Sequence, residues 1–145
     1  MTVNLIKLAV GIEDLAHLAE VQQRRLAIRK KAGDPLELFH VTRSFPRRAA
    51  EVLDGGSIYW VIKGLIRVRQ RITDLRETVN DAGKPACAIV YDATHFQTER
   101  RPFRAFQGWR YLDPGDAPRD LNELGAGAED LPDSMADELR DLGLL

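Results

Sequence analysis

The chain has one cysteine among its 145 residues, so no disulfide can form within it. Cys87 lies in the apolar run 86–91, a setting that favours a buried thiol over a nucleophile. No apolar run approaches the roughly 20 residues that span a bilayer, so we expect no membrane partner. The N-terminus lacks the pattern of a signal peptide, and we therefore expect a reducing, cytoplasmic location.

The sequence also lacks the motifs that identify common catalytic and cofactor sites. There is no GxxxxGK phosphate loop, no GxGxxG, no HExxH, no paired-cysteine zinc pattern and no GxSxG elbow. His95 has no histidine, cysteine or carboxylate partner at metal-ligand spacing. We accordingly assign no catalytic residue, no cofactor and no metal, and the sequence does not decide whether the protein is an enzyme.

The net charge of -1 hides an uneven distribution of charge along the chain. Residues 1–110 hold 19 Lys and Arg against 12 Asp and Glu, a balance of +7, whereas residues 111–145 hold 2 against 10, a balance of -8. A basic body with an acidic end favours an anionic partner, or an end that folds back on the body. We expect one domain at residues 1–118 and an acidic C-terminal extension at 119–145 with a short amphipathic helix.

Hydrophobic periodicity predicts an α+β fold. Strands are expected near 3–10, 36–43, 57–63, 65–76, 85–91 and 107–112, and helices near 12–32, 46–54 and 132–142. The segment 92–106 has no periodicity and is expected to be a loop. The predicted sheet is antiparallel and partly curled, with a PUA-like barrel as a variant, and two or three helices pack on it.

The clearest local pattern is a predicted hairpin that turns at Lys63-Gly64. In its second strand an apolar-rich set alternates with a basic set: Ile66, Val68, Gln70 and Ile72 against Arg67, Arg69, Arg71 and Thr73. One face therefore suits a core and the other carries three guanidiniums. In the first strand, Trp60 is expected in the core, whereas Tyr59 and Lys63 fall on the opposite face, near the arginine row.

A second basic group lies at the start of the helix expected at 46–54. Arg47 and Arg48 occupy its first turn, directly after Arg43 ends a strand, although the helix dipole is positive there. An anion bound at the unpaired amides would explain these cations. The alternative is that acidic side chains of the C-terminal extension neutralise them.

Four strings occur in a fixed order: LFHVTR, FPRRAAEVLDGGSIYWVIKG, RQRI and FQGWRYL. Together they resemble the bacterial family called domain of unknown function 1489, from the N-terminal strand to about Pro118. This resemblance implies a small cytoplasmic α+β protein and no particular activity.

The order of elements is also similar to the ASCH branch of the PUA-like superfamily, small β-barrel domains of which many bind RNA or modified nucleotides. Leu53-Asp54-Gly55 matches its helix end, and an aromatic strand and a basic strand follow. Gly56 and Ser57 stand where that signature has its lysine, and its glutamate is missing. This similarity therefore implies binding without nuclease chemistry.

These patterns lead to the hypothesis of a non-catalytic RNA- or nucleotide-binding module, either a monomer or a homodimer. The expected anion-binding and stacking residues are Arg43, Arg47, Arg48, Tyr59, Lys63, Arg67, Arg69, Arg71, Trp109 and Arg110. One alternative is an enzyme for a small phosphorylated or carboxylated substrate, with His40 or His95 as the acid–base group. Another is an interaction protein whose basic face meets its own acidic end or that of a second copy.

Overall fold

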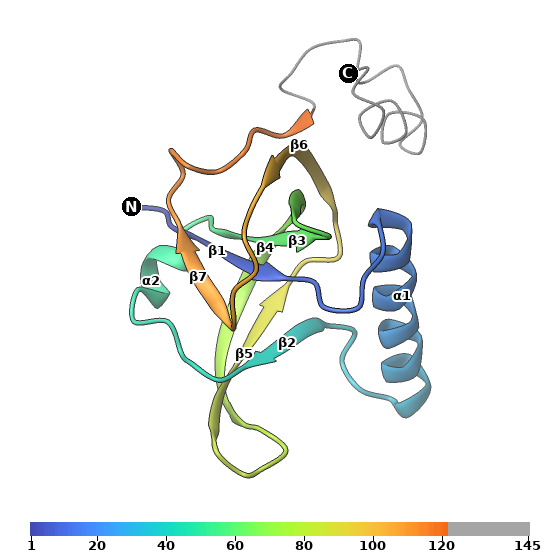
Figure 1. Cartoon of the computed structure of the whole chain (residues 1–145). Helices are drawn as coiled ribbons and strands as arrows, with labels where there is room; N and C mark the ends of the chain where they lie inside the picture. The colour runs from blue at the N-terminus through green and yellow to red at the C-terminus, as the bar shows by residue number, and fades with distance from the viewer. Residues whose placement is uncertain (122–145) are drawn as a thin grey trace.

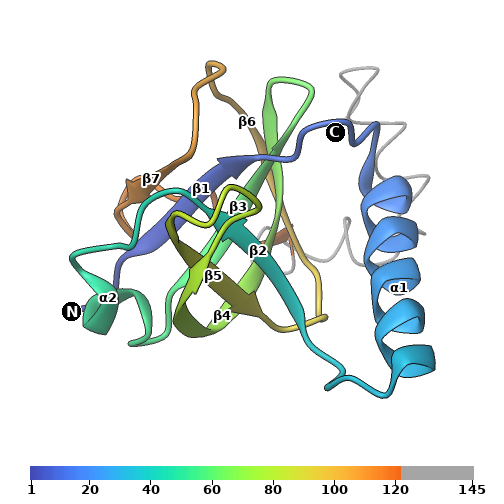
Figure 2. The same ribbon diagram turned by 90° about the horizontal axis from the view of Figure 1, so that it is seen from below.

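The computed structural model describes residues 1–121, which form an α+β fold that is mostly sheet. The strands are β1 (Asn4–Leu8), β2 (Leu38–Thr42), β3 (Ser57–Ile62), β4 (Leu65–Val79), β5 (Pro85–Tyr91), β6 (Phe96–Pro102) and β7 (Trp109–Leu112), and the helices are α1 (Leu15–Ala32) and α2 (Ala49–Val52). The helices lie at opposite ends of the sheet (Figures 1 and 2). The helix predicted near 132–142 lies outside the described residues.

The strands form one curled sheet in the order β2-β5-β4-β3-β1-β7, and β6 also pairs with β4. Among the described strands the two ends of this order, β2 and β7, do not pair, so the sheet is not closed into a barrel. β1 pairs with β3 in parallel, which corrects the prediction of an antiparallel sheet. The cause is the connection, because a crossover through α1, β2 and α2 permits parallel pairing and a short turn does not.

β4 is the long central strand, and a bulge near its start changes which way its side chains point. Trp60 pairs with Val68 but Val61 pairs with Ile66, so Arg67 is an extra residue on β4. A bulge of this kind reverses the alternation of the side chains beyond it. Ile66 therefore packs on the opposite face of the sheet from Val68, and the predicted single apolar face is wrong at Ile66.

Both faces of the sheet are covered by apolar side chains. The larger cluster, between the sheet and α1, includes Leu18, Ile58 and Trp60. It also contains Cys87, which is fully buried as predicted, and burial raises the pKa of its thiol to about 11. On the other face Tyr59, Val61 and Ile66 pack with Phe106, from the segment predicted to be a loop. That segment instead contains β6, so the prediction of a loop throughout 92–106 is wrong.

Local signals mark the two ends of α1, and the predicted hairpin turn at Lys63-Gly64 is confirmed. The side chain of Asp14 accepts the N–H of His17 at the start of α1, and Gly33 ends the helix in the left-handed conformation at φ 76°. The hairpin turns at Lys63 and Gly64, both with positive φ. The second helix is much shorter than the predicted range 46–54: α2 has only four residues, Ala49–Val52.

Candidate functional site

A hollow of about 940 Å³ opens beside α2, between the first residues of β1 and β3 and the segment that follows β7. Its size falls in the range of small-molecule sites, which is roughly 300–1,000 Å³. The hollow brings together three of the residues predicted from the sequence, namely Arg48, Tyr59 and Arg69. Asn4 and Ser57 also line it, although no sequence pattern singled out either residue.

Arg69 is held in one position by partners on three sides. Its Nε and Nη2 donate to Oδ1 and Oδ2 of Asp120 at 2.9 and 2.7 Å, and its Nη1 donates to Oγ of Ser57 at 2.9 Å. The guanidinium also lies 4.3 Å from the ring centre of Phe96. Two parallel hydrogen bonds to one carboxylate set both the position and the plane of an arginine. Arg69 is therefore a rigid part of the wall of the hollow.

Arg48 lies at the start of α2 and is paired within that helix. Its Nε and Nη2 donate to the two carboxylate oxygens of Glu51 at 2.6 and 3.1 Å, which raises the pKa of Arg48 and lowers that of Glu51. Its Nη1 is 4.0 Å from Asp113, a long contact. Glu51, a residue of α2 itself, therefore balances the charge of Arg48, so no bound anion is needed to explain an arginine at the start of this helix.

Two polar residues in the wall of the hollow, Asn4 and Ser57, are brought together by a close approach between the start of β1 and the turn before β3. A side chain at Gly56 would lie 2.3 Å from the carbonyl oxygen of Val3 and 2.4 Å from that of Val52, so only glycine fits. This approach lets Oδ1 of Asn4 accept the main-chain N–H of Ser57 at 2.9 Å. The two polar residues are thus fixed side by side in the wall.

Arg71 does not line the hollow but lies near Gly55, which does, because its Nη2 would be 3.8 Å from a side chain at Gly55. The other predicted residues do not line it: Arg43, Arg47, Lys63, Arg67, Trp109 and Arg110. Lys63 pairs with Glu13 at the hairpin turn, and Arg67 is buried at the bulge. The structure therefore does not gather the predicted arginines into one surface.

The aromatic and basic residues of β7 also have partners within the fold. Nε1 of Trp109 donates to the carbonyl of Ser44 at 2.9 Å, and its ring packs edge-to-face on Tyr111. The Arg110 guanidinium lies 4.8 Å from the ring centre of Phe106. These contacts place Trp109 and Arg110 in structural pairs away from the hollow.

Neither histidine proposed as an acid–base group lines the hollow. His40 packs edge-to-face on Trp60 at 6.0 Å between ring centres, and burial, with Lys7 and Arg25 nearby, lowers its pKa to about 4. Nε2 of His95 is 2.8 Å from Oε1 of Gln22, and burial lowers the pKa of His95. The hollow therefore does not support the enzyme alternative in the form that places a histidine beside these arginines.

His95 belongs to a buried polar network between α1 and the sheet, which the sequence did not reveal. The side-chain amides of Gln22 and Gln70 bond each other reciprocally at 2.8 and 2.9 Å, and Oε1 of Gln70 also accepts Nε1–H of Trp60 at 2.9 Å. The sequence signal that could have indicated this network is a glutamine among the apolar residues of each element, Gln22 in α1 and Gln70 in β4. Satisfied networks of this kind fix one arrangement of a core.

Residues 5–145 match the sequence model of one family, described as "Protein of unknown function (DUF1489)", which confirms the resemblance drawn from the four strings. No curated protein and no solved structure matches the chain, and the similarity to ASCH domains stays unconfirmed. Within residues 1–121, no helix is long and apolar enough to cross a membrane. No three histidine, cysteine or carboxylate side chains of this part of the chain gather as a metal site requires.

Proposed function

The chain belongs to the DUF1489 family, and we propose that it is a non-catalytic module that binds RNA or a nucleotide through phosphate contacts in the hollow beside α2. The observation that carries this proposal is the convergence of two fixed guanidiniums, Arg48 and Arg69, with the ring of Tyr59 in one hollow. The planar fork of arginine matches phosphate oxygens, and a fixed guanidinium loses little freedom when a ligand binds.

Arg48 is the residue to which we assign the first phosphate contact. The Arg48 side chain is 41% exposed. Glu51 occupies its Nε and Nη2, the guanidinium lies 5.3 Å from the ring centre of Tyr111, and within residues 1–121 the ion-pair contact of Nη1 is the long one with Asp113. A phosphate oxygen can replace this contact without breaking the pair with Glu51. Arg119 also lines the hollow, and Arg71 lies near Gly55 in its wall.

The charge of the described part of the chain supports an anionic ligand. Residues 1–121 hold 20 Lys and Arg against 15 Asp and Glu, a balance of +5. A net positive body attracts polyanions and speeds their association at low ionic strength. The similarity in element order to ASCH domains, many of which bind RNA or modified nucleotides, favours the same class of ligand.

The proposal is tested by measuring binding of labelled single-stranded RNA and of a labelled nucleoside monophosphate across a salt series. The affinity for RNA should fall as the salt concentration rises. In a plot of the logarithm of the association constant against the logarithm of the salt concentration, the slope should be about -0.7 for each phosphate contacted. We expect Arg48→Gln to weaken binding several-fold. The magnitude of the slope should decrease by about 0.7, the value for one lost phosphate contact.

Arg24→Gln is the matched control, because Arg24 is also an arginine paired to a glutamate within a helix, but it does not line the hollow. This variant should bind as the wild type does. Absence of binding by folded protein at low salt would overturn the proposal. An equal loss of affinity in the two variants would also overturn it, since binding would then reflect net charge alone.

A further inference from the structure

The free edge of β2 faces a groove between this strand and α1. Among the described strands β2 pairs only with β5, and Figure 2 shows it at the rim of the sheet with α1 beyond it. The groove measures about 450 Å³ and is lined by residues 37–41 together with Arg25, Ile28 and Arg29 of α1. Because consecutive strand residues line it, the groove follows an edge that pairs with no other strand of residues 1–121, and such an edge can pair with a strand of another chain.

Exposed apolar side chains gather along this edge. Four of the nine large hydrophobic residues that are exposed in residues 1–121 lie here, at Ile28, Leu36, Phe39 and Val41. Edge strands are normally protected by lysine, proline or a bulge, and β2 has none of these. The Arg29 guanidinium, 5.1 Å from the ring centre of Phe39, covers one side of that ring. An apolar patch on an open strand edge indicates a binding surface.

The sequence of β2 is complementary to an antiparallel copy of itself centred on His40. In this register Glu37 of one copy lies opposite Arg43 of the other, and Phe39 lies opposite Val41. Opposite charges, and an aromatic ring facing a β-branched side chain, are favourable cross-strand pairs. A two-fold axis produces each pair twice, as in an isologous interface.

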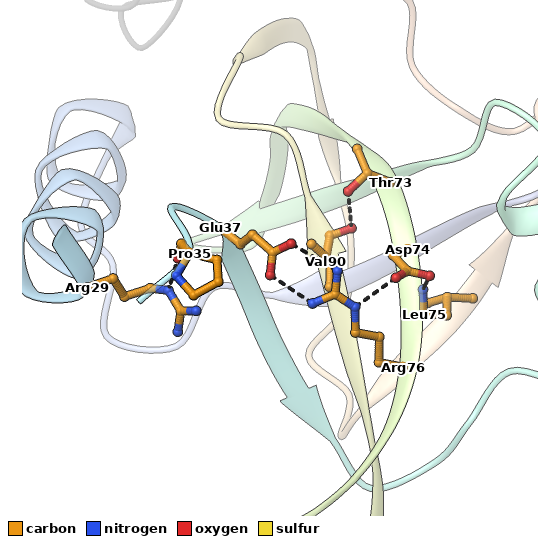
Figure 3. A network of polar contacts seen from close by, with 8 residues as sticks. All are labelled: Arg29, Pro35, Glu37, Thr73, Asp74, Leu75, Arg76 and Val90. Carbon is orange, nitrogen blue, oxygen red and sulfur yellow. Dashed lines mark hydrogen bonds and ion pairs between the residues drawn. The ribbon is translucent and has the colours of Figure 1, made fainter. Parts of the chain in front are cut away.

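The carboxylate in this register is already positioned by the fold. Figure 3 shows Glu37 at the start of β2, where Nη1 and Nη2 of Arg76 donate to its two oxygens at 2.8 and 2.9 Å. Arg76 is held in turn by Asp74, whose Oδ2 accepts its Nε–H at 2.7 Å. A carboxylate has about four lone-pair sites, so Glu37 can accept a further hydrogen bond from Arg43 of a second copy.

We propose that two copies of this chain associate by antiparallel pairing of their β2 edges about His40, which joins their sheets into one. The partner strand lies in the groove beside α1 and covers Phe39 and Val41. The interface is separate from the hollow beside α2, so nucleotide binding and dimer formation are independent properties.

Sedimentation equilibrium of the full chain over a range of concentrations tests this proposal. We expect a reversible dimer, and two variants that weaken it. Val41→Lys places a charge opposite Phe39, and Arg43→Glu places a carboxylate opposite Glu37. Each substitution acts twice in the symmetric dimer, so the dissociation constant should rise roughly tenfold or more. Adding Glu37→Lys to Arg43→Glu should restore part of the lost affinity, because the opposite charges face each other again.

Arg104→Glu is the control, because this exposed residue lies after β6, away from β2, and undergoes the same charge change. It should dimerise as the wild type does, and circular dichroism should show that every variant is folded. Hydrogen exchange at β2 should slow as concentration rises. A full chain that is monomeric at every concentration would overturn the proposal, and so would β2 amides whose protection does not depend on concentration.

Discussion

Arg69 on β4 forms a two-point ion pair with Asp120, which lies 51 residues further along the chain. The pair is largely shielded from water, since 23% of the Arg69 side chain and 16% of that of Asp120 are exposed. The backbone of Asp120 also forms an isolated antiparallel β-bridge with Thr98 of β6, and the side chain of Leu121 is buried. The beginning of the acidic C-terminal part thus folds back on the basic strand and neutralises one of its arginines.

Replacing Asp120 should therefore change stability and anion binding in opposite directions. Asp120→Asn leaves the half-buried Arg69 guanidinium without its counter-charge, and the free energy of unfolding should fall by about 1–3 kcal/mol. The same change makes the hollow more positive, so its affinity for a nucleoside monophosphate should rise. Urea unfolding and a fluorescence binding assay measure the two effects. Asp116→Asn is the control, because Asp116 is exposed and does not line the hollow. Unchanged anion affinity in Asp120→Asn would contradict the conclusion that Asp120 neutralises Arg69 at the hollow.

Gly56 should not tolerate any side chain. In Gly56→Ala the added carbon would lie 2.3 Å from the carbonyl oxygen of Val3, which directly precedes β1, and 2.4 Å from that of Val52. The backbone at residue 56 would therefore have to move away from both segments. We expect the free energy of unfolding to fall by about 3 kcal/mol or more. Gly115→Ala, where the new carbon meets open space, should leave thermal unfolding nearly unchanged. Equal melting temperatures for the two variants would show that the approach is not tight.

The buried amide network should make a large contribution to stability. Gln70→Leu removes the acceptor of the Trp60 indole N–H and both hydrogen bonds to the Gln22 amide, so the buried indole N–H loses its partner while Gln22 keeps its contact with His95. The free energy of unfolding should fall by about 3 kcal/mol, measured by urea titration with tryptophan fluorescence. Gln23→Leu on the exposed side of α1 is the control and should have little effect. In a double-mutant cycle, Gln22→Leu and Gln70→Leu should show strong coupling, and additive losses would argue against a shared network.

His40, which is half-buried, should make the protein less stable in mild acid. The pKa of His40 is lowered from 6.5 to about 4, so below pH 6.5 the unfolded chain takes up a proton that the folded chain refuses. The free energy of unfolding should therefore decrease as the pH falls from about 6.5 to about 4, by at most about 3 kcal/mol. The pKa of His95 is also lowered by burial, and that residue acts in the same direction.

Urea titrations at several pH values measure this effect, and His40→Asn should flatten the dependence. The paired carboxylates Glu37 and Glu51, whose pKa values are lowered by hydrogen bonds from Arg76 and Arg48, contribute only below their ordinary value of 4.5. The range above pH 4.5 therefore isolates the histidines. Gln23→Leu, which changes no titratable group, should retain the wild-type slope. A wild-type slope in His40→Asn would show that another group causes the acid sensitivity.

Much of the fold could be predicted because its signals are local. Alternation of apolar and polar residues located β3 and β4, and a glycine in the left-handed conformation ends α1 at Gly33. β6 was missed because its one fully buried residue is the polar Thr98, so no hydrophobic alternation marks it. The parallel pairing of β1 and β3 was missed because strand direction follows from the path of a long crossover, which no local pattern encodes.

The amino-acid order alone determined the main helix and most strands, the burial of Trp60 and Cys87, and the family, since each depends on neighbouring residues or on fixed strings. Only the tertiary structure decided which arginines face the hollow. The bulge at Arg67 depends on pairing with β3, and the neutralisation of Arg69 depends on a carboxylate 51 residues away. Contacts between distant residues arise when the whole chain packs, and charge counted along the sequence does not specify them.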